Sequence, residues 1–164
     1  MIRFVSFGIA ALLLALPTTG FGQQASDEVA EGRAMVQAGR EQLIRSELRF
    51  TDEEAAAFWP IYERYQAASS AIGDRYAGLL TEYVDRYHSG DLNDEYAVRL
   101  LEEYFGIKQE MLDVQTKYSP KFMAVLPALK VAQFFQLENK IRAEIDAQLA
   151  IAIPLIAVPP IDPT

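Results

Sequence analysis

The sequence FTDEEAAAFWPIYERY, residues 50–65, begins a long amphipathic segment that continues to His88. Thr51 can cap the first helical turn, and Glu54 can reach back to the Thr51 backbone amide. Along the segment, apolar or small residues recur at alternating steps of three and four, which is the spacing of a buried helix seam. The members of this seam are Phe58, Tyr62, Tyr65, Ser69, Ile72, Tyr76, Leu79 and Tyr83. We therefore predict one helix over this segment, kinked near Pro60 because proline lacks the amide hydrogen that a helix uses.

Two further helices are predicted on either side of this segment. Ser26 can cap a helix over residues 27–47, and Asn93 can cap a helix that continues to Tyr118. The loop that precedes Asn93 is only a few residues long, and Gly90 within it suits a left-handed helix stop. Because short loops join helices that run in opposite directions, we expect an antiparallel hairpin here.

The last third of the sequence predicts a short helix, a longer helix and an extended tail. Ser119 followed by Pro120 is a favourable helix start, because proline is tolerated in the first helical turn. We expect a short helix from there to Leu126 and a last long helix over residues 128–150. Residues 151–164, IAIPLIAVPPIDPT, are apolar, hold four prolines and should be extended. The predicted fold class is all-α, with about four long, kinked amphipathic helices in antiparallel hairpins plus the short one.

Residues 1–22 have the features of a secretory signal peptide. Arg3 supplies a positive charge, an apolar run follows, and small residues stand before Gln23. The apolar run is too short and wrongly flanked to remain as a stable membrane anchor. We therefore expect cleavage near Gln23 and a single helical domain over residues 23–150, located in the periplasm of a cell that has an outer membrane.

The composition argues against several classes of protein. The chain carries 15 Lys and Arg against 23 Asp and Glu, a net charge of −8, so a nucleic-acid partner is not expected. It has no cysteine, which means no disulfide and no lipid attached through cysteine. Basic residues nevertheless outnumber acidic ones between residues 108 and 142. This contrast indicates either complementary faces within one fold or dimer, or a surface for anions or lipids.

No set of residues suited to catalysis, cofactor binding or metal binding is visible. The single histidine, His88, stands at a predicted helix end, where it favours the helix dipole without needing another role. The spacing of a calcium loop is present in Asp91, Asn93, Glu95 and Glu102, but Tyr96 occupies the position that requires glycine. Asn93 as a helix cap explains the same pattern. We therefore expect no enzyme, no cofactor and no metal site.

Aromatic side chains supply the candidate binding residues instead. All eight tyrosines lie between Tyr62 and Tyr118, and tyrosine can cover an apolar seam while its hydroxyl stays in water. They form either a partly hydrated core or an adaptable surface for unfolded segments. The candidates for a client-binding surface are Tyr62, Tyr65, Tyr76, Phe122, Met123, Phe134 and Phe135. The alternative is that all seven fill the core.

These features resemble the Spy/CpxP family of periplasmic helical proteins. The family's Leu-Thr-x-x-Gln motif at helix starts would correspond to residues 50–54, FTDEE, which keep the threonine, and to residues 126–130, LPALK, which keep the leucine. The stretch LPALKVAQFFQLENKI also looks like relatives that act as sensors or regulators. Over residues 41–150, the resemblance implies a cradle-shaped homodimer of long kinked helices without enzyme chemistry.

The resemblance also implies a function. It points to a periplasmic, ATP-independent holdase chaperone or envelope-stress adaptor that binds unfolded or envelope proteins on an apolar, tyrosine-rich helical surface. The alternative is a structural or regulatory envelope protein that binds one specific partner without general chaperone activity. A holdase would suppress the aggregation of many clients, whereas a specific binder would retain a single partner.

Overall fold

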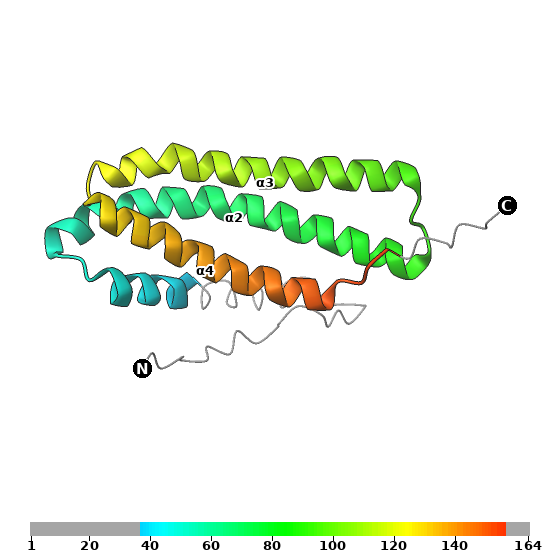
Figure 1. Cartoon of the computed structure of the whole chain (residues 1–164), viewed down its shortest axis with the longest axis horizontal. Coiled ribbons are helices and arrows are strands. Elements are labelled where there is room, and N and C mark those ends of the chain that lie inside the picture. The colour runs from blue at the N-terminus through cyan, green and yellow to red at the C-terminus, as the bar shows by residue number, and fades with distance from the viewer. Residues whose placement is uncertain (1–36, 157–164) are drawn as a thin grey trace, which may run out of the picture. The chain divides into compact units, whose positions relative to one another are not determined.

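The computed structural model describes residues 37–156, and in this range the chain is all-helical with no strand (Figure 1). Residues 37–49 and the described residues from Phe50 onward belong to two separate compact units. Residues 37–48 of the first unit are helical. The second unit holds three long helices: α2 (Asp52–Ser89), α3 (Asp94–Met123) and α4 (Ala128–Ala152). The all-α prediction is confirmed, while the predicted signal peptide and the end of the tail lie outside the described residues.

Both ends of α2 have the chemistry that the sequence predicts. The Glu54 backbone amide donates to Thr51 Oγ1 at 3.2 Å, and the Thr51 amide donates to the Glu54 carboxylate at 2.9 Å, which completes a capping box. The Lys130 ammonium binds the same carboxylate at 2.5 Å and so ties the start of α2 to α4. The contact with Lys130 and the Thr51 amide hold the pKa of Glu54 below its usual value. At the far end, Gly90 ends the helix with φ at 75°.

Two prolines lie inside helices, and the second lies where the sequence predicted the start of a separate short helix. α2 continues through Pro60, so the helix is not broken there. The separate short helix predicted from Ser119 is wrong, because Ser119 and Pro120 belong to α3, which ends at Met123. Phe122 is fully buried, and its packing requires the last turn of α3 to keep facing the core.

α2 and α3 form the predicted antiparallel hairpin (Figure 1). The Tyr96 amide donates to the Asn93 side chain at 2.9 Å, which confirms Asn93 as the cap of α3. In the middle of the hairpin, Ile72 and Leu79 of α2 pack with Ile107 of α3. Ile72 and Leu79 belong to the predicted seam, so the periodicity identified the inner face of α2 correctly.

α4 joins the hairpin through a layer of aromatic side chains. Phe58 of α2, Phe122 of α3 and Phe134 of α4 are fully buried. The ring centroids of Phe122 and Phe134 lie 4.8 Å apart, and Phe58 lies 5.2 Å and 5.3 Å from these two rings. Such distances are typical of favourable aromatic pairs. The aromatic layer therefore lies where α2 begins, α3 ends and α4 starts.

The tail begins two residues later than the sequence predicts. α4 continues to Ala152, after which Ile153 adopts an extended conformation. The Tyr83 hydroxyl donates a hydrogen bond of 2.7 Å to the Pro154 carbonyl, so the start of the tail is held by the far end of α2. Between residues 37 and 156, no helix has both the length and the apolar character required to cross a bilayer.

Candidate protein-binding surfaces

Four of the seven predicted binding residues lie in the core. Their side chains are 0% exposed: Tyr62, Tyr65, Phe122 and Phe134. The ring of Tyr65 lies 5.8 Å from the rings of both Phe122 and Phe134, and the ring of Tyr62 lies 6.1 Å from that of Phe134. While the chain is folded, these four side chains present no surface to a client. For these four residues the burial agrees with the alternative that they fill the core, because α4 covers this side of α2.

The polar tip of Tyr65 is accommodated inside the protein. Its hydroxyl lies 3.4 Å from the carboxylate of Glu138, which is only 1% exposed. Burial raises the pKa of Tyr65, and the negative charge of Glu138 raises it further. Tyr65 and Glu138 therefore form a polar contact between α2 and α4 within the aromatic layer.

The other three predicted residues remain accessible in part. Phe135 is half-buried at the edge of the aromatic layer, with its ring 6.2 Å from that of Tyr65. Tyr76 is half-buried in the hairpin, and its ring lies 6.2 Å from that of Tyr104. Met123, at the end of α3, is 51% exposed. The structure thus separates the seven candidates into a buried group and a surface group that do not form one patch.

A further apolar surface runs along α3, and sequence reasoning did not select it. We call its five residues the outer stripe: Val98, Leu101, Phe105, Leu112 and Met123, which are 51% to 63% exposed. The first four follow each other at steps of three, four and seven, which places them on one side of a helix. The buried residues Ile107 and Tyr118 lie on the opposite side. The signal that identifies the stripe is this second apolar periodicity, out of phase with the inner seam.

The charges along α3 change sign from its first half to its last ten residues. The first half carries Asp94, Glu95, Glu102 and Glu103 against Arg99 and Lys108. Residues 114–123 carry Lys117 and Lys121 and no acidic side chain. The outer stripe therefore begins in a mainly acidic region of α3 and ends in a basic one.

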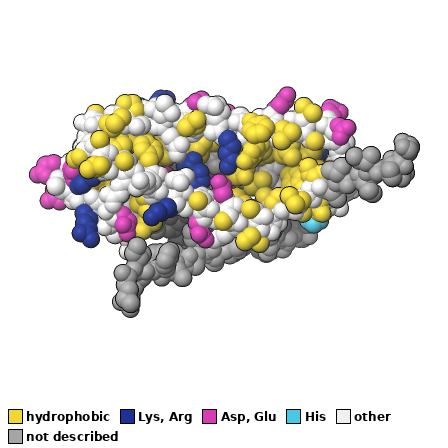
Figure 2. Space-filling view, viewed as in Figure 1, with side chains coloured by type: hydrophobic (Ala, Val, Ile, Leu, Met, Phe, Trp, Pro, Cys, Tyr) yellow, Lys and Arg dark blue, Asp and Glu magenta, His cyan; other side chains and the backbone are white. Residues whose placement is uncertain are grey.

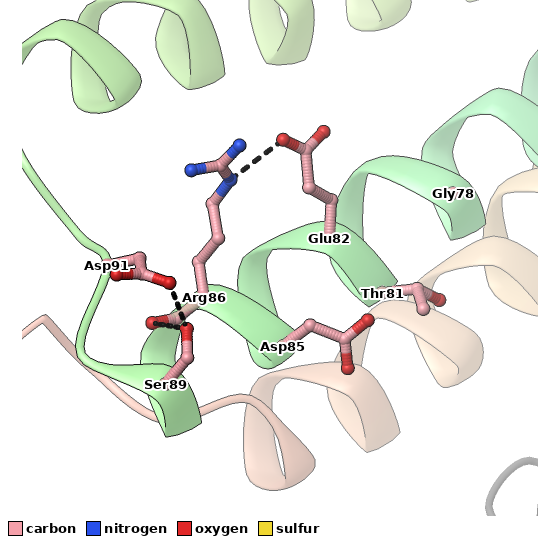
Figure 3. A pocket seen from close by; sticks show the side chains of 7 residues that line it. All are labelled: Gly78, Thr81, Glu82, Asp85, Arg86, Ser89 and Asp91. Carbon is pink, nitrogen blue, oxygen red and sulfur yellow. Dashed lines mark hydrogen bonds and ion pairs between the residues drawn. The ribbon is translucent and has the colours of Figure 1, made fainter.

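A shallow polar depression lies at the loop end of α2 (Figure 3). The residues that line it are Gly78, Thr81, Glu82, Asp85, Arg86, Ser89 and Asp91. Arg86 Nε donates to Glu82 at 2.9 Å, and Arg99 of α3 binds the same Glu82 oxygen at 2.6 Å. Within residues 37–156, no three His, Cys, Asp or Glu side chains gather where they could hold a metal ion. Glu82 in the depression therefore connects α2 to α3 near the loop between them, through its ion pair with Arg99.

Comparisons with known protein families, with characterised proteins and with solved structures find no match to this chain. The resemblance to the Spy/CpxP family therefore stays a prediction. What the molecule can bind has to be argued from its own surfaces, of which the outer stripe is the most exposed apolar one on α3.

The contrast between core and outer stripe predicts two different responses to the same substitution. Phe134→Ala should lower the free energy of unfolding by about 3–5 kcal/mol, because it leaves a cavity in the aromatic layer. Phe105→Ala removes the same ring from an exposed position and should change stability by only about 0.5 kcal/mol. Urea unfolding followed by circular dichroism measures both. Equal losses would show that the outer stripe is part of a core.

Proposed function

We propose that this protein binds other polypeptides as a periplasmic, ATP-independent holdase chaperone or envelope-stress adaptor. The outer stripe is the observation that supports this function most. Its five large apolar side chains follow one face of a helix and are open to solvent. An exposed apolar helix face of this kind is typical of protein-interaction surfaces.

The mechanism that fits the outer stripe is reversible burial of apolar segments of a client. Each Å² of apolar surface removed from water contributes about 25 cal/mol, before the cost of ordering the client. The stripe is one helix wide and includes the flexible side chain of Met123, which adapts to different partners. The net charge of −8 would keep a complex soluble and would favour basic clients.

The charge reversal along α3 favours a second use of the outer stripe, as the interface of a homodimer. In an antiparallel pair of α3 helices, the acidic first half of one copy would face the basic last ten residues of the other. Phe105 and Leu112 lie on either side of the middle of the stripe. Phe105 of one copy would therefore contact Leu112 of the other copy, and Leu112 of the first would contact Phe105 of the second. The alternative function is a regulatory or structural protein that binds one specific partner. That function also requires a fixed register between the two binding surfaces.

Replacement of the stripe's centre tests client binding. The double variant Leu101→Ser with Phe105→Ser should lose most of the ability to suppress aggregation of a model client, with little change in melting temperature. The matched control is Leu129→Ser with Ile151→Ser, which alters two side chains that are 86% and 88% exposed but lie on α4. Light scattering of a thermally unfolded client measures suppression. A wild-type chain that suppresses no aggregation would end the holdase proposal.

Sedimentation velocity at micromolar concentration tests the dimer. We expect a two-chain particle that Phe105→Asp converts to a monomer, because a charge at the centre of the stripe would be buried without a partner. Glu102→Lys should weaken the dimer, and Lys117→Glu in the same chain should restore part of it. A wild-type chain that stays monomeric contradicts the homodimer.

Because clients and the second copy need the same side chains, they would compete for the outer stripe. Suppression of client aggregation, measured per chain, would therefore rise on dilution.

The periplasmic location rests on the sequence of residues 1–22, which lie outside the described part of the chain. Mass spectrometry of envelope protein should find a mature N-terminus near Gln23. A cytosolic chain that keeps Met1 would contradict export.

A further inference from the structure

α4 is packed tightly along its first half and loosely along its second. Its buried residues are Val131, Phe134 and Glu138, and no residue of α4 after Glu138 is buried. Ile145, which continues the same side of the helix, is already 37% exposed, and Ile151 is 88% exposed. The aromatic layer therefore fixes residues 128–138, whereas the rest of the helix lacks a comparable core.

Through Asp146, the second half of α4 meets a tyrosine-lined part of the hairpin. We call this part the tyrosine surface: Tyr76, Leu100, Tyr104 and Met111, all partly buried against the core of α2 and α3. The Lys108 ammonium lies 4.8 Å from the ring centre of Tyr76 and 5.4 Å from that of Tyr104. Asp146 of α4 lies 3.7 Å from this ammonium. Figure 2 shows hydrophobic side chains at the surface in the half of the view that holds the hairpin loop.

Among the described residues, one ion pair and one hydrogen bond tie this segment to the hairpin, and the charge of Arg142 also acts on Tyr65. The Lys108–Asp146 ion pair is 38% and 42% exposed, so solvent screens it and it contributes little. The Tyr83 hydroxyl donates to the Pro154 carbonyl at 2.7 Å, and a single hydrogen bond of this kind is readily exchanged for one to water. Glu138, fixed against Tyr65, marks the last point of tight packing.

We propose that residues 139–156 are a displaceable cover, and that the tyrosine surface beneath accepts an amphipathic helical segment of another polypeptide in its place. The chemistry of the replaced contacts defines that segment. It carries apolar residues three or four apart to meet the tyrosines, and a carboxylate that takes the place of Asp146 on Lys108. A segment without the carboxylate would leave the lysine without its ion pair. This second surface does not depend on the outer stripe.

Hydrogen exchange of the full mature chain tests whether the cover opens. Amides of residues 139–152 should exchange at least tenfold faster than those of residues 128–138. Lys108→Glu should raise exchange of the cover several-fold, and adding Asp146→Lys should restore the wild-type rate. Tyr83→Phe, which keeps the ring and removes the hydroxyl, should raise it as well. Uniform protection along α4, or rates that none of these changes affects, would overturn the cover.

A synthetic peptide with the sequence of residues 139–156 tests what the tyrosine surface accepts. Fluorescence anisotropy should show saturable binding of the labelled peptide to the full chain. Asp146→Lys in the chain weakens the cover and should tighten peptide binding several-fold, while Lys108→Glu should weaken it. A peptide with Asp146→Asn is the matched control and should bind several-fold more weakly. Absence of binding even to the Asp146→Lys chain would refute the second surface, whatever the outer stripe does.

Discussion

The aromatic layer between α2, α3 and α4 is the interaction on which the arrangement of the helices depends. The loop from α3 to α4 is short, and α4 starts at Pro127 without a side-chain cap. Its position is therefore set by packing, above all by Phe134 against Phe122 and Phe58. Each buried ring removes about 150–250 Å² from water, which at about 25 cal/mol per Å² corresponds to about 4–6 kcal/mol as an upper limit.

This layer also explains why apolar surface is left uncovered. α3 has apolar side chains on two sides, yet α2 and α4 contact only the inner one. Covering the outer stripe would require another helix on the far side of α3 or a second molecule. An exposed apolar stripe lowers solubility unless charge surrounds it. The acidic and basic side chains along α3 provide that charge, which is why the proposed binding surface includes them together with the stripe.

The sequence predicted well whatever depends on near neighbours. Thr51, Gly90 and Asn93 act within one helical turn, and each has the role expected of it. The prediction of a helix start at Ser119 and Pro120 was wrong. The local chemistry of these two residues favours a helix start, whereas burial of Phe122 favours continuation of α3. Local preferences are worth about 1 kcal/mol, less than burying a phenylalanine ring. Long-range packing therefore prevails where the two disagree.

The binding residues were harder to predict, for a reason that Tyr65 and Tyr76 show. Both lie on the same seam of α2, about three turns apart, and their sequence surroundings are alike. Tyr65 is fully buried with Glu138 because the fixed half of α4 crosses it. Tyr76 stays half-buried beside Lys108 because it faces the loosely packed half.

Periodicity assigns both tyrosines to the inner face of α2, but only the course of a distant helix decides how deeply each is buried. The same reasoning separates the two halves of α4 itself. Phe134 lies near four aromatic rings of the hairpin, whereas Ile145, on the same side of α4, is 37% exposed. Tight packing therefore ends near Glu138, where the aromatic layer ends, although α4 remains helical for another fourteen residues.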